Sequence, residues 1–163
     1  MCGVFGIIYS KETDKLGDSL IKGSRKLVYR GYDSAGFASF KEDGSTMLEK
    51  GPGMLEDIIK SKNISEFSGK RGIVQLRWAT FGEPNEENSQ PHYDSDKDII
   101  GAHNGNIVNT EQLSEKFKAE GMTVRGTNDG EMVVHAYEKF YNQYHDMKKA
   151  MMEAQTLLKG DYA

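Results

Sequence analysis

The first residues of the chain place its only cysteine, Cys2, directly before a short apolar run. The run over 4–8 contains a valine, a phenylalanine and two isoleucines, and Gly3 and Gly6 interrupt it. Apolar runs of this length are typical of buried strands, and they are too short to span a membrane. We therefore predict a strand over 3–9, with Cys2 held at the edge of a packed sheet.

Cys2 has the chemistry of a nucleophile once the initiator Met1 is removed, as is normal before a small residue. Cys2 would then carry both a thiol and a free α-amino group. The thiolate is the reactive form of cysteine, and an α-amine titrates near ~8, close enough to neutrality to accept a proton. An N-terminal amine is a recognised activator of a side-chain nucleophile. The alternative is an ordinary frayed terminus.

The composition suits one soluble globular domain and excludes several classes of function. A chain of 163 residues is long enough to bury a core. Its net charge of −4 predicts no nucleic-acid partner and no membrane partner. The single cysteine excludes an internal disulfide framework and favours a reducing compartment, so we expect a cytoplasmic protein. The four histidines lack metal-site spacing, and no phosphate-binding glycine motif is present, so we expect no metal and no cofactor.

The hydrophobic pattern predicts an α+β fold with largely antiparallel sheets, because strands come first and helices follow with little strict alternation. The predicted strands cover 3–9, 34–40, 45–50, 72–78 and 98–103. The predicted helices cover 14–29, 54–60, 110–120, 130–143 and 146–158. A polar stretch over 81–97 reads as a long loop.

Three features predict helix ends and faces. Asn109, with Gln112 three residues later, predicts a variant of the capping box, and Asp129 is the expected N-cap of the following helix. The last helix is expected to bury one face, formed by Met147, Met151, Ala154 and Leu158. Residues 160–163 look like a helix C-cap followed by a new strand. We therefore expect a single domain over 1–163 that is incomplete at its C-terminal end.

One polar block lies at the start of the predicted hairpin, and another begins at the end of the predicted strand over 72–78. In the block over 29–36, Arg30 and Asp33 flank a glycine turn, and a local ion pair at a helix exit is the alternative to a functional role. In the block over 77–84, Arg77 ends an apolar strand and precedes Trp78. A guanidinium there can hold a carboxylate through two hydrogen bonds, and the alternative is an arginine that caps a sheet edge.

Two further blocks carry polar groups of a different kind. The Asn104 side-chain amide and the Gly105 N–H offer two donors for one developing oxyanion, although Asn-Gly taken alone favours a tight turn. Asp129 can bind an amino group, although taken alone it favours a helix cap. His103 is an alternative base for Cys2, less favoured than the α-amine because that amine is covalently fixed beside the thiol.

Together these blocks resemble class II glutamine amidotransferases, which belong to the N-terminal-nucleophile hydrolases. The Cys-Gly start and the blocks over 29–36, 77–84 and 103–105 are similar, in that order, to the glutaminase domain of glutamine–fructose-6-phosphate amidotransferase. The stretches 88–91 and 102–109 look more like amidophosphoribosyltransferase. The resemblance covers essentially the whole chain.

The resemblance implies a four-layer αββα sandwich with Cys2 at a strand end. It implies that Cys2 attacks the side-chain amide of glutamine while its α-amine moves the proton. Asn104 and the Gly105 N–H would form the oxyanion hole. A nucleophile, a proton carrier and two oxyanion donors are what acyl transfer from an amide requires.

The resemblance also implies a pocket for free glutamine, which carries one anion and one cation. Arg77 would hold the α-carboxylate and Asp129 the α-ammonium group. Trp78 and Thr80 would line the pocket, and Arg30 would support the surroundings of the nucleophile.

Two positions depart from the family pattern. Phe81 stands where the synthase pattern has histidine, which leaves that detail of the pocket and the acceptor specificity open. The stretch 128–131 reads Asn-Asp-Gly-Glu in place of the more usual Thr-Asp-Thr/Ser-Glu.

The leading hypothesis is therefore the glutamine-hydrolysing part of an amidotransferase. It would form a γ-glutamyl thioester at Cys2 and release ammonia for an acceptor, with a sugar phosphate favoured, as in amino sugar biosynthesis. Its partners would be L-glutamine and a synthase domain or subunit, which this chain lacks, and a homo-oligomer is compatible with this picture. The alternatives are a stand-alone N-terminal-nucleophile amidohydrolase and a non-catalytic module that binds glutamine for regulation.

Overall fold

The structure, a computed structural model, describes residues 2–79 and 82–163. The chain forms two compact units, Met1–Pro91 and His92–Ala163, which are considered one at a time. All the strand pairings within the two units are antiparallel. The expected α+β class with antiparallel sheets is confirmed.

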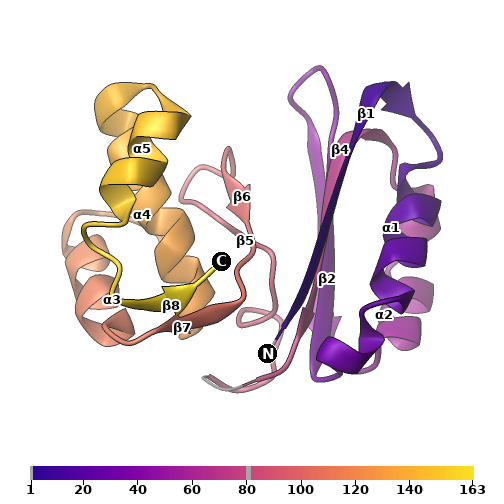
Figure 1. Ribbon diagram of the computed structural model, residues 1–163, viewed down its shortest axis with the longest axis horizontal. Coiled ribbons are helices and arrows are strands. Elements are labelled where there is room, and N and C mark those ends of the chain that lie inside the picture. The colour runs from indigo at the N-terminus through magenta and orange to yellow at the C-terminus, as the bar shows by residue number, and fades with distance from the viewer. Residues whose placement is uncertain (1, 80–81) are drawn as a thin grey trace. The chain divides into compact units, whose positions relative to one another are not determined.

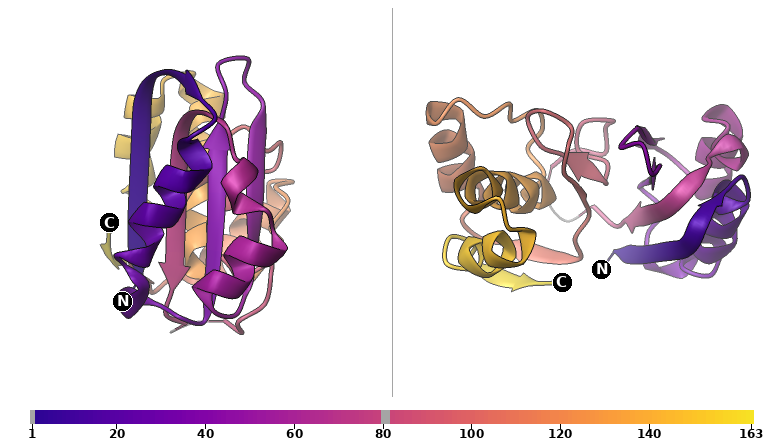
Figure 2. Two further views of the ribbon diagram at one scale, coloured as in Figure 1. Left: turned by 90° about the vertical axis from the view of Figure 1, so that its right-hand side faces the viewer. Right: turned by 90° about the horizontal axis from the view of Figure 1, so that it is seen from above.

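The first unit is a four-stranded antiparallel sheet in the order β1-β4-β2-β3. Its strands are β1 Gly3–Thr13, β2 Ser34–Phe40, β3 Thr46–Pro52 and β4 Gly69–Arg77. Its helices are α1 Leu16–Arg25 and α2 Leu55–Ser61, with short 3-10 turns at Val28–Arg30 and Ile64–Glu66. Helices α1 and α2 cover the same face of the sheet (Figures 1 and 2).

The core of this unit lies between α1, α2 and the covered face of the sheet. Alternate strand residues such as Phe37 and Val74 point to that face, as the two-residue period of a strand requires. Leu16 and Leu20, one helical turn apart on α1, pack into the same cluster. All four side chains are buried, so their apolar surface contributes directly to the stability of the unit.

The second unit consists of three helices and two short antiparallel strand pairs. The strands are β5 His92–Tyr93, β6 Ile100–Gly101, β7 Gly105–Ile107 and β8 Gly160–Tyr162. The helices are α3 Thr110–Ala119, α4 Asp129–Tyr144 and α5 Met147–Ala154. Strand β5 pairs with β6, and β7 pairs with β8, so the predicted strand beginning at Gly160 is confirmed. A second apolar cluster, with Phe117, Met132 and Ala154 among its members, joins the three helices.

The first helix is shorter than predicted, because its last turn tightens. The N–H groups of Lys26 and Leu27 donate to carbonyls three residues earlier, at Gly23 and Ser24. Such bonds end a regular α-helix and are common at helix termini. The predicted helix over 14–29 therefore ends at Arg25, and a 3-10 turn follows.

The predicted caps are wrong at two helices. The Asn109 side chain does not cap α3 and instead binds the backbone ahead of β8, accepting from Lys159 N at 3.0 Å and donating to Leu157 O at 2.9 Å. The N-cap of α4 is Asn128, whose Oδ1 accepts from Gly130 N at 2.9 Å. Asp129 is thus free of the capping role that its position in the sequence suggests.

The predicted buried face of the last helix is half wrong. Ala154 and Leu158 are buried, whereas Met147 and Met151 are exposed by 36% and 45%. The strand predicted over 98–103 is reduced to the two residues of β6, and the short strand β7 was not predicted. Segments this short carry too few residues for a periodic pattern to mark them.

Candidate functional site

The pairing of β1 with β4 brings Cys2 to the end of β4. Gly3 lies opposite Leu76 in the register of the two strands. Cys2 is therefore beside the residues that follow β4, and its Sγ lies 3.9 Å from the backbone oxygen of Trp78. Cys2 is partly exposed, as a nucleophile that meets a substrate must be.

Arg30 lies next to the same strand end. A Cβ atom added at Gly3 would stand 3.1 Å from the Cβ of Arg30, so the backbone of β1 runs directly against this residue. The Arg30 guanidinium also lies over the ring of Tyr29, with 5.6 Å between its central carbon and the ring centroid. The structure thus brings Arg30 against Gly3, the residue next to Cys2.

The turn after Arg30 is locked onto the end of β4. A Cβ at Gly31 would stand 2.6 Å from the carbonyl carbon of Arg77, so only glycine allows this approach. Asp33 N donates to Arg77 O at 3.1 Å, and the Asp33 carboxylate accepts from Ala79 N at 2.7 Å. The first two polar blocks of the sequence are therefore one structural unit.

Arg77 is 1% exposed and ends β4, opposite Ser34 of β2. Its guanidinium donates to Gly82 O at 3.0 Å and to Glu83 O at 3.2 Å. These two bonds tie the following loop to the strand, as expected of an arginine at a sheet edge. The predicted hold on a substrate carboxylate stays a prediction.

Trp78 lies at the surface beside this strand end. Its ring is 43% exposed and stands 5.3 Å from that of Tyr32, centroid to centroid. Thr80, the other predicted lining residue, lies outside the described residues, as does Phe81. We refer to Cys2, Arg30, Arg77 and Trp78 as the Cys2 cluster.

In the second unit, the Asp129 carboxylate joins two segments. It is 4% exposed, and its Oδ2 accepts from Ile107 N at 2.9 Å and lies 3.1 Å from His103 Nε2. Burial alone would raise the pKa of Asp129, but the hydrogen bond and charge of His103 and the Ile107 N–H outweigh it and lower the pKa. Asp129 is therefore an ionised, buried carboxylate at neutral pH.

Asn104 and Gly105 do not form the tight turn that the dipeptide alone favours. Gly105 is the first residue of β7 and pairs with Tyr162 of β8. Asn104 N donates to Ala163 O at 2.8 Å, and Ala163 N donates back to Asn104 O at 2.9 Å. A Cβ at Gly105 would stand 2.3 Å from Asp161 O, so glycine is required here.

These contacts place His103, Asn104, Gly105 and Asp129 in one group, the Asp129 cluster. His103, considered above as an alternative base, is buried and makes its 3.1 Å contact with Asp129. His103 thus has a partner within its own unit that orients its ring.

Lys50 at the end of β3 went unnoticed in the sequence. It is 8% exposed, and its Nζ donates to Ser89 O at 2.7 Å and to Glu87 O at 3.3 Å. A Cβ at Gly36 would stand 2.2 Å from Gln90 O, on the face of the sheet opposite α1. Lys50 therefore anchors the segment that runs over this face. No pattern marks such a residue, because lysine at a strand end is usually exposed.

The described ranges, 2–79 and 82–163, show neither a metal site nor a membrane-spanning helix. Among these residues, no group of three or more histidine, cysteine, aspartate or glutamate side chains is arranged to hold a metal ion. Within the same ranges, no helix has the length and apolar character needed to cross a membrane.

Comparisons with known proteins agree with this arrangement. Residues 76–163 match a family described as a glutamine amidotransferase domain. The glutamine–fructose-6-phosphate aminotransferase (isomerizing) of Sulfolobus acidocaldarius is 37% identical over 163 residues, which are 100% of this chain and 28% of that protein. The corresponding protein of Staphylococcus aureus is 39% identical over 100% of this chain and 26% of its own length. The chain thus spans about a quarter of the length of these relatives.

Solved structures give the same result for the fold. Glutamine phosphoribosylpyrophosphate amidotransferase from B. subtilis, complexed with ADP and GMP, matches with a TM-score of 0.81 and 27% identity, over 100% of this chain and 34% of that one. The similarity confirms the predicted N-terminal-nucleophile fold and the predicted enzyme class. The chain therefore belongs to the glutamine amidotransferase domain family, the glutamine-hydrolysing modules of amidotransferases.

Proposed function

We propose that this domain hydrolyses glutamine to glutamate and ammonia, with Cys2 as the nucleophile. The observation that carries the proposal is the position of the only cysteine, at the start of β1 and 3.9 Å from the backbone oxygen of Trp78, in a glutamine amidotransferase domain. A partly exposed thiol at a rigid strand end can meet a substrate without losing its place.

In this proposal, removal of Met1 frees the α-amine of Cys2. The amine takes the proton of the thiol, and Sγ attacks the side-chain carbonyl carbon of glutamine. The amide nitrogen then takes that proton and leaves as ammonia, which produces a γ-glutamyl thioester. Water attacks the thioester carbon, releases glutamate and restores the thiol.

The negative charge that develops on the carbonyl oxygen needs donors already in place. We assign this role to the side-chain amide of Asn104 and the N–H of Gly105. Support comes from their rigid setting, since the pairing of β7 with β8 and the two backbone bonds to Ala163 fix both residues. Donors that need no rearrangement during the reaction stabilise the charge most effectively.

Recognition of free glutamine falls to two buried charges. Arg77 would bind the α-carboxylate, with Trp78 and Thr80 lining the pocket and Arg30 supporting the nucleophile. Asp129 would bind the α-ammonium group, and its lowered pKa supports this assignment because the carboxylate stays ionised at neutral pH. A charged side chain opposite each charge selects a free amino acid over a neutral amide.

The fate of the ammonia is the finer part of the proposal. The two aminotransferase relatives are about four times longer than this chain, so we propose that a synthase domain or subunit receives the ammonia. We favour a sugar phosphate as the acceptor, as the names of these relatives suggest. In this picture residues 1–163 are the glutaminase domain, acting in the cytoplasm, where reducing conditions keep a free thiol available.

The test is intact mass spectrometry of the purified protein before and after incubation with 6-diazo-5-oxo-L-norleucine, a glutamine analogue that alkylates a catalytic thiol. We expect the loss of Met1 and a single adduct on Cys2, together with release of ammonia from glutamine. The variant Cys2→Ser is the control and should take no adduct.

A processed wild-type protein that takes no adduct and releases no ammonia would refute the proposal. Binding of glutamine without turnover would then favour a regulatory module, and turnover of other amides alone would favour a stand-alone amidohydrolase.

A further inference from the structure

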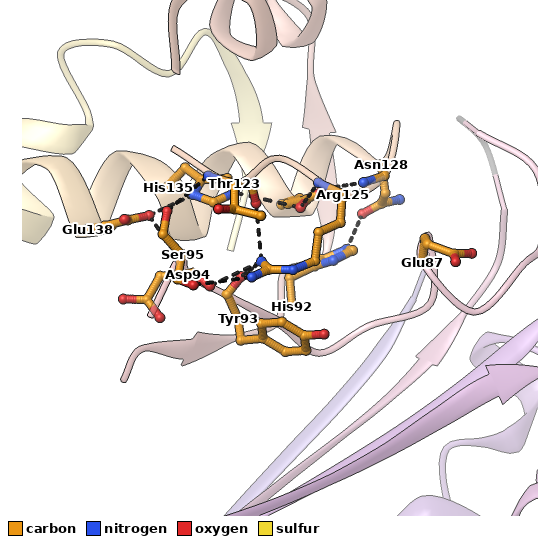
Figure 3. A network of polar contacts seen from close by, with 12 residues as sticks. Glu87, His92, Tyr93, Asp94, Ser95, Thr123, Arg125, Asn128, His135 and Glu138 are labelled. Carbon is orange, nitrogen blue, oxygen red and sulfur yellow. Dashed lines mark hydrogen bonds and ion pairs between the residues drawn. The ribbon is translucent and has the colours of Figure 1, made fainter. Parts of the chain in front are cut away.

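The segment that precedes α4 has no regular secondary structure between 122 and 128, yet it leads directly into Asp129. Backbone N–H groups in such a segment need acceptors from side chains or water. Two of them, at Arg125 and Gly126, find acceptors in one side chain, Glu131. Figure 3 shows the polar network around this segment.

Glu131 uses both of its carboxylate oxygens on the segment. Oε1 accepts from Arg125 N at 2.7 Å, and Oε2 accepts from Gly126 N at 2.7 Å. The side chain is 1% exposed, so water does not compete for these bonds. Two short bonds from one buried carboxylate fix the position and the orientation of the backbone three and four residues before Asp129.

His135 and Glu138 lie one and two turns further along α4 than Glu131. Together with Glu131 they form a chain of charged contacts along this helix. His135 Nδ1 lies 2.7 Å from Glu138 Oε2, while His135 Nε2 lies 3.6 Å from Glu131 Oε1. The second distance is too long for a hydrogen bond, so this contact is electrostatic. Glu138 also accepts from Ser95 N at 3.2 Å, which ties α4 to the residues after β5.

The Arg125 side chain fastens the segment on its other side. Its guanidinium donates to the carbonyls of Tyr93, Asp94 and Ser95, at 3.3, 3.1 and 3.2 Å, and lies 4.3 Å from the Tyr93 ring centroid. A fourth bond goes to Thr123 O at 3.1 Å, and dashed lines in Figure 3 converge on this guanidinium. Planar guanidinium groups suit such multiple contacts, which a lysine cannot reproduce.

The last link before Asp129 is Asn128. Its Oδ1 accepts from Gly130 N at 2.9 Å and lies 2.9 Å from Nε2 of His92 in β5. Hydrogen bonds thus tie Arg125, Gly126 and Asn128 to β5 or to α4. The 125–128 backbone is therefore held from two sides, and the place of the Asp129 carboxylate follows from it.

We propose that Glu131 and Arg125 are positioning residues that fix the 125–128 backbone and thereby set the affinity of Asp129 for the α-ammonium group of glutamine. This inference rests on the proposed function, because it assumes that Asp129 meets that group. Glu131 and Arg125 touch no substrate in this proposal and act only through the backbone that carries Asp129.

The test compares Glu131→Gln with the wild-type protein by two measurements. Glutamine keeps the shape of the side chain but offers one oxygen to two N–H groups, so one of the two bonds is lost. Hydrogen–deuterium exchange should rise about tenfold at whichever of residues 125 and 126 loses its bond. Alkylation of Cys2 by 6-diazo-5-oxo-L-norleucine, which carries the α-ammonium group, should slow about tenfold.

Two controls make the result specific. Iodoacetamide carries no α-ammonium group, so its rate with Cys2 should stay within about twofold of the wild-type rate. Glu115→Gln on the exposed face of α3 is the matched variant and should change neither measurement. If Glu131→Gln does not fold, Arg125→Lys is the alternative variant. Arg125 is half-buried, and a lysine there cannot reproduce its guanidinium bonds, so the same segment should loosen. Both measurements should then change in the same direction.

Unchanged exchange at 125 and 126 would overturn the positioning role. Raised exchange with an unchanged rate for the analogue would show that the segment is held by Glu131 but does not set the affinity, which also overturns the proposal. A wild-type protein that does not react with the analogue would instead refute the proposed function, while the exchange result would still report on the segment.

Discussion

Replacement of Glu131 by glutamine should remove a part of the stability that depends on pH in a defined way. Burial alone would raise the pKa of Glu131, but contacts with His135, the Arg125 N–H, His92 and the Gly126 N–H outweigh it and lower the pKa from 4.5 to about 2. A carboxylate with a depressed pKa stabilises the fold above its unfolded pKa, and that contribution is lost as the pH falls through the folded value.

The size of the effect follows from the difference between 4.5 and about 2, which is about 2.5 pKa units. At about 1.4 kcal/mol per unit, Glu131 contributes roughly 3 kcal/mol to the free energy of unfolding at pH 7. The same linkage leaves roughly 1 kcal/mol at pH 3. The difference between wild type and Glu131→Gln should therefore shrink by about 2 kcal/mol between these two pH values.

His135 also stabilises the fold, but its contribution has the opposite pH dependence. Burial would lower its pKa, but Glu131 and Glu138 on either side outweigh burial and raise the pKa above 6.5. Its contribution is complete below pH 6.5 and is lost as the pH rises through the folded pKa. Glu131→Gln should weaken this contribution too, so the variant should lose less stability than the wild type between neutral and alkaline pH.

The assay is urea unfolding of both proteins at pH 3, 5 and 7, followed by circular dichroism. Glu115→Gln, on the exposed face of α3, is the control and should follow the wild type at each pH. A difference between wild type and Glu131→Gln that stays constant from pH 7 to pH 3 would refute the reasoning, because it would mean that Glu131 is not held as an ion.

Three further predictions concern the Asp129 cluster and the segment over the sheet. Asp129→Asn should raise KM for glutamine about 10–100-fold with a smaller change in kcat, measured by ammonia release, since the buried charge that we propose binds the substrate is lost. Gly105→Ala should destabilise the protein by about 1–3 kcal/mol and lower kcat, because the new Cβ would stand 2.3 Å from Asp161 O. Gly6→Ala, where the nearest atom is 3.8 Å away, should change the thermal midpoint little, and an equal effect of both substitutions would contradict this account. Lys50→Met should expose the segment over 82–90 to proteolysis, because Nζ loses its bond of 2.7 Å to the backbone there, and unchanged cleavage would argue against an anchoring role.

Much of the first unit was predictable because its signals are local. The alternating residues of β2 and β4 and the helical spacing of Leu16 and Leu20 depend only on neighbours along the chain. The predicted hairpin over 34–40 and 45–50 agrees with β2 and β3 to within two residues. The polar blocks also stood out in the sequence because each is dense in functional groups, and these blocks carried the family resemblance.

The partners of the polar residues were not predictable, because each depends on a segment far away in the sequence. Asp129 looks like a helix cap from its neighbours, yet Asn128 takes the cap and Asp129 binds Ile107 N, 22 residues away. Asn109 likewise looks like a cap and binds the chain 48 residues further on. The local sequence pattern indicates which residues can donate or accept, and tertiary packing determines which of them form hydrogen bonds.

The chain alone was enough to establish the α+β class, the order of the main elements, the nucleophile candidate Cys2 and the family to which the blocks belong. The class, the order of elements and the candidate nucleophile follow from periodicity and from residue types at short spacing, which neighbouring residues determine. The family follows from the resemblance of the ordered blocks to known amidotransferases. Tertiary structure alone decided which groups meet. It put Gly3, next to Cys2, against Arg30, began a strand at Gly105 where Asn-Gly suggested a turn, and used Glu131 to hold the backbone before Asp129. The physical reason is that buried donors and acceptors must all be satisfied, and only the folded chain brings their partners within reach.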